Sequence, residues 1–294
     1  MANFGMDFNP DTYLSAGQLL IDYRYHILVV SIIVLTMAEI YEPARTPPGT
    51  RWKNRIHNLS ISAMYLLLGG VLGVGMVWIA IKTEALHIGL FNMLPMPTWL
   101  KVMLGFLVFD LAEYVRHRIS HAYPALWRVH RIHHSDPLMD VSTAFRNHPL
   151  NWITIYPPRA LAVVLFGVPP VTLAIYTVVW FVTTSFHHSN ISVARFSPRL
   201  QSLLDLVIVT PDRHYVHHAR TDHSQTDSQF GVVFIFWDKL FGTLTTAPDR
   251  RIFEQGLEDI VEESDQTLVG MLKQPFKPVK HGSSPEGLGL SDPT

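Results

Sequence analysis

The sequence predicts an all-α protein built as a bundle of several transmembrane helices. Charged residues make up only 16% of the chain, against roughly 25% in an average soluble domain. Hydrophobic residues reach 48% and occur in long runs, and a run of about 20 such residues is long enough to cross a bilayer. The 294 residues therefore predict membrane-spanning helices joined to a substantial polar part.

The remaining composition excludes several classes of protein. Lys and Arg (23) nearly balance Asp and Glu (24), so the net charge gives no indication of a nucleic-acid partner. The absence of cysteine excludes disulfides, iron–sulfur clusters, thiolate-ligated haem and cysteine nucleophiles within the chain. The opening residues, MANFGMDFNPDTYL, lack the basic and apolar regions of a secretory signal, so we expect insertion through internal spans.

Two apolar runs predict the first membrane helices. The first covers about residues 25–41 and ends before Pro43, and the second covers 59–81, which has 23 residues without a charge. The connection between these runs is basic, with Arg45, Arg51, Lys53 and Arg55. Because basic loops stay on the cytoplasmic side of a membrane, this connection is predicted to be cytoplasmic.

Two later apolar regions determine the predicted position of the polar part. Residues 99–115 are expected to return the chain to the cytoplasmic side, and 152–186 is typical of a helical hairpin interrupted by GVPP at 167–170. Each arm of this hairpin has about 16 residues, which is short for a full crossing. Both ends of a hairpin lie on the same side, so residues 117–149 and the chain after 187 are predicted to share the cytoplasmic face.

The polar part is rich in histidine, with 11 of the 16 histidines between residues 117 and 218. HRISH contains an i,i+4 pair, and the motif HxxHH occurs twice, as HRIHH and as HYVHH. Residues three or four apart lie on one side of a helix, and the adjacent extra histidine extends the reach to a second metal. These motifs contain His117, His121, His130, His133, His134, His214, His217 and His218.

With His188 from FHHSN, the motifs offer nine imidazoles. Two closed tetrahedral zinc sites need about eight ligands, so nine suits two metals of higher coordination that keep open positions. The zincin motif HExxH is absent, and Glu84 and His87 form only a single isolated ExxH, whereas carboxylate di-iron bundles need paired ones. The prediction is therefore a transmembrane bundle with a helical cap on its cytoplasmic face that carries a histidine-rich site for two metals.

The order of these motifs resembles that of the fatty acid hydroxylase/sterol desaturase superfamily, a group of integral-membrane di-iron oxygenases. The resemblance covers about residues 100–245 and rests on DLAEYVRHRISH, LWRVHRIHHS, RNHP, FHHSN, TPDRHYVHH and FWDKLFGT. It implies a transmembrane region at 1–98, a catalytic domain at 99–246 and a C-terminal cytoplasmic segment at 247–294. The end of that segment, from Lys273 onward, is rich in Pro, Gly and Ser and is predicted to be disordered.

The resemblance also implies the metal ligands. In FHHSN the family pattern H-x-N falls on His188 and Asn190, while His187 occupies a position that varies in the family. Three roles are open to His148 in RNHP: ligation, a hydrogen bond to a ligand, or capping of the following helix. His26, His57, His87, His223 and His281 lie outside every motif and are expected to be ordinary histidines. The ligands implied by the family are His117, His121, His130, His133, His134, His188, His214, His217 and His218, with His148 and His187 as further candidates.

Polar residues near the motifs are candidates to support the ligands. Asp110 and Tyr114 lie seven and three residues before His117, so they form one helical stripe with the HRISH pair. A carboxylate there is expected to hold the outer nitrogen of a ligand histidine, and the alternative is a buried Asp110 paired elsewhere in the bundle. Asp212, two residues before His214, is a similar candidate. The expected supporting residues are Asp110, Tyr114, Asn190 and Asp212.

The family implies that O2 is reduced at two ferrous ions and that a C–H bond of a membrane lipid, fatty acyl chain or sterol is hydroxylated or desaturated. Hydroxylation is favoured because the desaturases are a narrower branch. The chain has no GxGxxG context, cysteine cluster or evident haem-binding domain, so electrons must come from a separate donor of the ferredoxin or cytochrome b5 type with its reductase. The implied location is a bacterial inner membrane or the endoplasmic reticulum. Four arginines near the ligands are either cytoplasmic-face charges or contacts for lipid headgroups and the donor: Arg116, Arg118, Arg128 and Arg131.

Two other functions stay open at this stage. A zinc-dependent membrane hydrolase would use the same imidazoles to generate hydroxide, and a non-catalytic membrane protein would only bind or transport the metal. Zinc binds such sites more tightly than ferrous iron, so zinc is also expected as a substituting metal. A transporter should hold its ligands near the bilayer midplane, whereas these motifs lie at or beyond the ends of the apolar runs.

Overall fold

The computed structural model of the chain describes residues 10–46, 51–220, 226–245 and 254–279. These residues form helices and no strand, with only two isolated bridges between extended residues. The predicted all-α fold class is therefore confirmed. The long helices are α1 (Pro10–Tyr41), α2 (Arg51–Ala85), α4 (Thr98–Ala122), α6 (Trp152–Phe166) and α7 (Pro170–His188).

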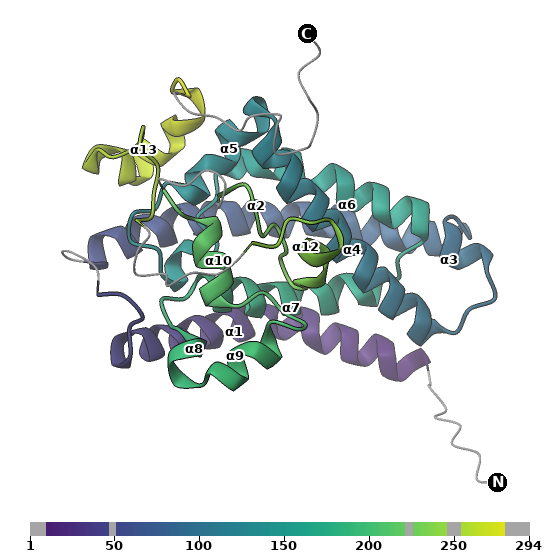
Figure 1. Cartoon of the computed structure of the whole chain (residues 1–294). Helices are drawn as coiled ribbons and strands as arrows, with labels where there is room; N and C mark the ends of the chain where they lie inside the picture. The colour runs from purple at the N-terminus through teal and green to yellow at the C-terminus, as the bar shows by residue number, and fades with distance from the viewer. Residues whose placement is uncertain (1–9, 47–50, 221–225, 246–253, 280–294) are drawn as a thin grey trace.

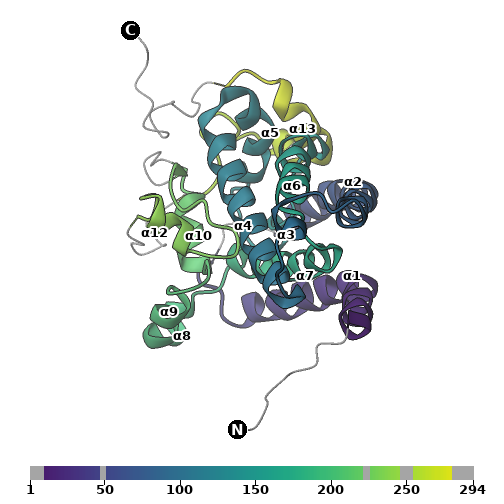
Figure 2. The same cartoon turned by 90° about the vertical axis from the view of Figure 1, so that its right-hand side faces the viewer.

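The long helices lie side by side as a bundle (Figure 1). α1 packs along α7, α2 packs against α6, and α4 contacts both α6 and α7. The view along the bundle shows α7 between α1 and α4 (Figure 2). In the core, the rings of Tyr65 and Trp152 stack with centroids 5.0 Å apart, and the Trp152 indole donates to the Tyr65 carbonyl oxygen at 2.9 Å.

Some of these helices have the length and apolar character needed to cross a membrane. The outer face of α2 is apolar, since Leu67 and Val71 are 74% and 71% exposed, as suits contact with lipid tails. By contrast, α6 has only 15 residues, and α4 carries the buried acids Asp110 and Glu113 within its apolar stretch. The predicted crossing by 99–115 therefore stays a prediction. The stretches that qualify among the described residues are Asp22–Tyr41, Arg51–Met93 and Pro170–His188.

The predicted interruption of the region 152–186 is confirmed: α6 and α7 are two helices joined by a short turn, although α6 packs mainly on α4 and α2, and α7 mainly on α1. Gly167 ends α6 in the left-handed conformation (φ 71°), which glycine adopts without steric cost. Gly89, before the short helix α3 (Leu90–Met93), packs on this turn with φ 92°, and a Cβ there would lie 2.2 Å from the Gly167 nitrogen. Two glycines therefore join the α2–α4 connection to the turn between α6 and α7.

Short helices build a cap beside the long ones (Figures 1 and 2). α10 packs against α7, and α13 packs against α2. α5 and α10 each start with a proline at the first helical position, where the missing N–H costs nothing. The helices of the cap are α5 (Pro124–His134), α8 (Val193–Phe196), α9 (Pro198–Leu204), α10 (Pro211–His217), α12 (Phe236–Leu240) and α13 (Leu268–Lys273).

The disorder predicted from Lys273 onward is wrong for the first part of that segment. Residues 274–278 pack against α5, where the buried guanidinium of Arg131 donates hydrogen bonds to three of their carbonyl oxygens. Arg128 donates to two carbonyl oxygens of the same segment. Composition missed this order because the two arginines that bind the segment lie far away in the sequence. Residues 280–294 lie outside the described residues.

Candidate metal centre

Nine of the predicted ligand histidines come together in the interior of the cap. They belong to four helical segments: the end of α4, the end of α5, the last residue of α7, and α10 with the residue that follows it. None of the nine side chains is more than 6% exposed. Buried imidazoles at this density are suited to metal ligation, because each carries a nitrogen lone pair.

The nine histidines form two groups, within each of which the ligand nitrogens lie within 4.8 Å of one another. The i and i+4 histidines of HRIHH belong to the first group and the i+3 histidine to the second, while HYVHH divides the opposite way. This division follows from the helix, where adjacent residues point about 100° apart. The first group is His117, His121, His130, His134 and His217, and the second is His133, His188, His214 and His218.

The Nε2 atoms of each group face one another. In the first group, Nε2 of His134 lies 3.1 Å from that of His121 and 3.2 Å from that of His130. In the second group, Nε2 of His188 lies 2.9 Å from that of His133 and 3.0 Å from that of His214. Neutral imidazoles cannot all donate to one another, so converging lone pairs at these distances fit a cation at the centre of each group.

Among the described residues, the outer Nδ1 atoms of four of these histidines have acceptors in the backbone or in a carboxylate. Nδ1 of His117 lies 2.9 Å from the Phe230 carbonyl oxygen, and Nδ1 of His188 lies 2.7 Å from the Thr184 carbonyl oxygen. A carbonyl acceptor requires Nδ1–H, which leaves the lone pair on Nε2. The other two are His217, 2.6 Å from the Ser228 carbonyl oxygen, and His121, 3.2 Å from an Asp227 carboxylate oxygen.

Burial also keeps the cap imidazoles in the neutral form that binds metals. It lowers the pKa of His134 and His218 well below the ordinary value, and the neighbouring imidazoles lower it further. Burial has the same effect on the pKa of His130, His214 and His217. Deprotonated imidazole nitrogen is the ligand form, so the donor set fits two metal ions of the kind that imidazole prefers.

The two further histidine candidates lie outside both groups. Nδ1 of His148 accepts a hydrogen bond from the Leu150 backbone N–H at 3.1 Å, which caps the short helix that begins at Pro149. Of the three roles considered for His148, the structure therefore supports capping of the following helix. His187 is buried, and its ring centroid lies 4.2 Å from that of His214.

The expected contact between Asp110 and a ligand histidine is wrong. The Asp110 carboxylate accepts hydrogen bonds from the Tyr176 hydroxyl, the Trp237 indole and two backbone N–H groups, those of Val233 and Phe234. The alternative, a buried carboxylate paired elsewhere in the bundle, is correct. Asp110 thus attaches the segment after residue 230 to α4, next to the carbonyl of Phe230 that binds a histidine.

The other expected supporting residues also contact neighbouring segments. The Tyr114 hydroxyl lies 2.8 Å from the Thr243 hydroxyl. The Asn190 side chain binds the backbone N–H and carbonyl of Arg45. Asp212 accepts from the Ser192 hydroxyl and the Val193 backbone N–H. These contacts hold the histidine-bearing segments against the rest of the cap.

Sequence reasoning missed two acidic residues beside the first group. Asp227 binds His121 directly, but it stands alone in a polar stretch and shows no motif spacing. Asp238 accepts from the backbone N–H groups of Phe230 and Gly231, which holds the turn that presents the Phe230 carbonyl to His117. Asp238 lies in FWDKLFGT, so the motif was recognised without a role for its carboxylate.

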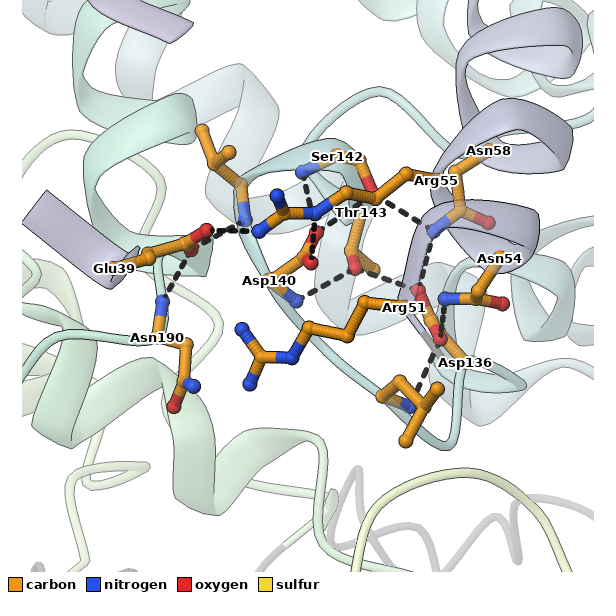
Figure 3. A network of polar contacts seen from close by, with 12 residues as sticks. Glu39, Arg51, Asn54, Arg55, Asn58, Asp136, Asp140, Ser142, Thr143 and Asn190 are labelled. Atoms are coloured by element: carbon orange, nitrogen blue, oxygen red, sulfur yellow. Dashed lines mark hydrogen bonds and ion pairs between the residues drawn. The ribbon is translucent and has the colours of Figure 1, made fainter. Parts of the chain in front are cut away.

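A buried polar network beside the second group was also missed (Figure 3). Arg55 forms ion pairs with Glu39 at 2.8 Å and with Asp140 at 2.7 Å. The second Glu39 oxygen accepts from the backbone N–H groups of Val141 and Asn190. α1 and α2 are therefore bound to the two segments that follow His134 and His188.

The network continues with Asp136, which follows α5, and with Arg146. Asp136 accepts hydrogen bonds from Asn54, Asn58 and Thr143 (Figure 3). Burial alone would raise the pKa of Asp136, but the charge of Arg146 and these hydrogen bonds bring it below its ordinary value. The fully buried Arg146 donates to the Asn58 side chain at 2.6 Å.

Two of the basic residues used for the topology prediction have partners inside the protein. Arg55 is paired with two carboxylates, and Arg45 donates to the Tyr215 hydroxyl at 2.8 Å. The α1–α2 connection therefore lies at the histidine end of the molecule. Of the arginines considered for partner contacts, Arg116 is paired with Glu113 at 3.1 Å, and Arg128 and Arg131 bind the C-terminal segment.

The fold and the site define a helical membrane protein whose cap holds a histidine-rich site suited to metal ions. Residues 102–243 match the family model for fatty acid hydroxylase. Together with the relatives described next, this match fits the fatty acid hydroxylase/sterol desaturase superfamily. The resemblance seen in the sequence is therefore confirmed. No solved structure matches the chain.

Three curated relatives are similar to part of the chain. Alkylglycerol monooxygenase of Danio rerio is 31% identical over 160 residues, 53% of this chain and 32% of the relative. The ornithine lipid hydroxylase OlsE of Rhizobium tropici is 29% identical over 181 residues, 61% of this chain and 51% of the relative. Cholesterol 25-hydroxylase of Rattus norvegicus is 27% identical over 173 residues, 57% and 54% of the two chains. The match thus spans between a third and about half of each relative.

Proposed function

We propose that the protein is an O2-dependent hydroxylase of membrane lipids whose two histidine groups each hold one iron ion. The observation that carries this proposal is the division of nine buried imidazoles into two adjacent groups. The names of the relatives, a monooxygenase and two hydroxylases of lipid or sterol, support hydroxylation over desaturation. The hydrolase and the non-catalytic alternatives find no support among these names.

In this proposal the Nε2 atoms of the two groups are the metal ligands. Bound ferrous ions would supply the electrons that activate O2 for attack on a C–H bond. The chain itself holds the ligand imidazoles in the Nε2 form through the carbonyls of Phe230, Thr184 and Ser228, and it excludes bulk water by burying them. A separate donor of the ferredoxin or cytochrome b5 type, with its reductase, would restore the electrons.

An apolar cavity in the bundle supports a hydrocarbon substrate. It measures about 380 Å³ and lies between α1, α2, α6 and α7. Phe109, Trp180 and Phe181 line its wall, and the last two lie on the helix that ends at His188. A volume of this size accommodates part of an acyl chain or a sterol. We therefore propose the cavity as the place of the substrate's hydrocarbon part.

Gly73 offers a direct test of this cavity. It lines the cavity, and a Cβ at this position would meet nothing within 4 Å, so a larger side chain is tolerated there. Gly73→Phe is expected to reduce kcat/KM for a lipid substrate about tenfold or more, because the ring displaces the chain from the metals, while metal content stays normal. The matched control is Val71→Phe on the same helix, where the side chain is 71% exposed. Equal activity of the two variants would contradict the cavity assignment.

The proposed organisation follows the sequence prediction. Residues 1–98 are a transmembrane region, 99–246 the catalytic domain and 247–294 a C-terminal segment, and the family match at 102–243 lies within the second of these. We propose a multi-pass protein with its cap on the cytoplasmic side of a bacterial inner membrane or the endoplasmic reticulum. Labelling with an impermeant reagent tests this topology, with a cysteine introduced at Asn92 expected to react from outside and one at Gly282 only after permeabilisation.

The reaction is tested with 18O2. Membranes containing the protein, a reductant and a reductase are incubated under labelled oxygen, and the lipids are analysed by mass spectrometry. A hydroxylated lipid that carries one 18O is the expected result, whereas a desaturated product would lose two hydrogens and carry no label. Label that arrives only from water, without a need for O2, would contradict the proposal and favour the zinc hydrolase.

A further inference from the structure

A polar pocket of about 250 Å³ lies beside the second histidine group, apart from the apolar cavity. Its described walls come from Arg45 after α1, the start of α2, residues 137–139, Asn190, α10 and the segments at 220 and 254–255. Among the described residues, three guanidinium groups and one carboxylate supply its lining charges, those of Arg45, Arg51, Arg220 and Glu254. An excess of cationic groups in a concave site favours an anionic ligand.

The arginines of this pocket are held in place by hydrogen bonds, and two of them, Arg51 and Arg220, keep a buried Nε without a partner among the described residues. Arg45 donates a hydrogen bond to the Tyr215 hydroxyl at 2.8 Å, and the Asn190 side chain binds both the backbone N–H and the carbonyl oxygen of Arg45. Arg51 donates from Nη2 to the Arg45 carbonyl oxygen at 3.2 Å. Figure 3 shows the Arg51 side chain reaching from α2 toward Asn190. Its Nε is buried and has no partner among the described residues, so a strong donor is unused.

Arg220 adds a second unused donor. Its Nε is also buried without a partner in the described part of the chain. Its Nη1 lies 3.4 Å from Glu254, whose side chain is 66% exposed, so this ion pair is weak. The two buried acids behind Arg51, Glu39 and Asp140, share one partner, Arg55, so their charges also attract Arg51. Counted with these two acids, Arg55 and Glu254, the described charges around the pocket still leave a net positive charge of one for a ligand.

We propose that this pocket binds a phosphate-type anion, carried either by a lipid headgroup or by free phosphate. Planar guanidinium groups pair with oxyanions through two parallel hydrogen bonds, and phosphate offers enough oxygens for three arginines. The volume suits a phosphate with a small substituent and is too small for a lipid chain. The α1–α2 connection joins two stretches that qualify as membrane spans, so the pocket lies where a headgroup is within reach.

A ligand in this pocket contacts the metal-bearing segments directly. Tyr215 follows His214 in the sequence, and Asn190 lies two residues after His188. Binding there would order the two segments that carry the second histidine group. The site itself requires neither iron nor O2 and is therefore independent of the proposed reaction.

Binding is measured with the purified full chain in a non-ionic detergent. One arm titrates inorganic phosphate against chloride at equal ionic strength, and the other compares dihexanoyl phosphatidic acid with dihexanoyl glycerol, each followed by calorimetry and by the thermal unfolding midpoint. Saturable binding of phosphate alone assigns the site to free phosphate. Preference for phosphatidic acid over both phosphate and the glycerol lipid assigns it to a headgroup.

Single substitutions test whether anion binding depends on this pocket or only on the overall positive charge of the protein. Arg51→Gln and Arg220→Gln are each expected to weaken binding about tenfold, because each removes charge-assisted hydrogen bonds. Lys53→Gln is the matched control, since Lys53 is exposed and outside the pocket. Among the described residues, the Arg220 side chain pairs with the exposed Glu254 alone, so Arg220→Gln keeps the test valid if Arg51→Gln fails to fold. Failure of phosphate and phosphatidic acid to bind, or equal weakening by Lys53→Gln, would overturn the proposal.

Discussion

The two histidine groups are built from the same motifs but are supported by different parts of the molecule. In the first group, three outer nitrogens bind residues 227–230. Asp238 of α12 holds the backbone of Phe230, and Asp110 of α4 binds the chain just after it, at Val233 and Phe234. In the second group, His188 is bound by its own helix, and the chain that follows it is attached to α1 by Glu39. The first group therefore depends on one folded-back segment, and the second on the first two helices.

The two groups thus share the motifs that supply their ligands but not the contacts that orient those ligands. Each HxxHH motif contributes to both groups, so the two proposed metals share α5 and α10. The contacts that orient the ligands are not shared. A change far from the imidazoles is therefore expected to affect one proposed metal more than the other, and the following variants test this.

The largest effect is expected from removing a ligand at the centre of either group. His134→Ala should lose the metal of the first group, and His218→Ala that of the second, because each imidazole is buried against several others of its group. Both variants should lose most activity. Metal analysis of the purified variants checks this, with His26→Ala, which lies outside both groups, as the control. Full metal content in His134→Ala would break the assignment.

Asp110→Asn should disturb the first group. The amide cannot accept from all four donors that the carboxylate binds, so the free energy of unfolding is expected to fall by about 2–4 kcal/mol. The metal of the first group should be lost before that of the second. Denaturant unfolding and metal release during dialysis measure the two effects. Tyr176→Phe, which removes one of the four donors, should cost about 1 kcal/mol.

Glu39→Gln should disturb the second group instead. The amide has one acceptor oxygen, so it keeps either the contact with Arg55 or the two backbone contacts, which share one oxygen, at an expected cost of about 1–3 kcal/mol in unfolding free energy. The second metal should then be released first. Glu42→Gln is the control, because the pair of Glu42 with Arg195 is half exposed and should contribute little. Preferential loss of the first metal in Glu39→Gln would contradict the separate supports.

The smallest effect is expected at Asp227, whose side chain is 27% exposed. Asp227→Ala removes the acceptor for Nδ1 of His121 without removing a ligand. The affinity of the first group for metal should fall about tenfold, with the fold unchanged. Competition with a chelator measures this affinity, and Glu263→Ala on the exposed surface is the control. An affinity equal to that of the control would show that Asp227 is dispensable.

Local sequence patterns predicted what depends on helix geometry. Apolar runs predicted the long helices and the interruption at Gly167, and the spacings of 3 and 4 predicted which histidines share a face. The structure brings these histidines together, while their metal ligation stays a prediction. The division of each HxxHH between two groups also follows from the helix, once the partner helices are known.

Contacts between distant segments were beyond such reasoning. Asp110 was placed on the correct helical stripe, but its partners lie more than 60 residues away and compete with any histidine for the carboxylate. The C-terminal segment has a composition typical of disorder, yet Arg131 orders it through backbone carbonyls, which every residue type provides. Glu39 was read as part of an apolar span, because its partner Arg55 lies beyond a connection.

The central claim is that the cap holds two metal ions in two separable groups. Anaerobic titration of the metal-free chain with ferrous ions, followed by equilibrium dialysis and iron analysis, tests it most directly. Two equivalents per chain are expected, and His134→Ala and His218→Ala should each retain one, in different groups. A single equivalent in the unaltered chain, or loss of both from either variant with the fold intact, would contradict the account.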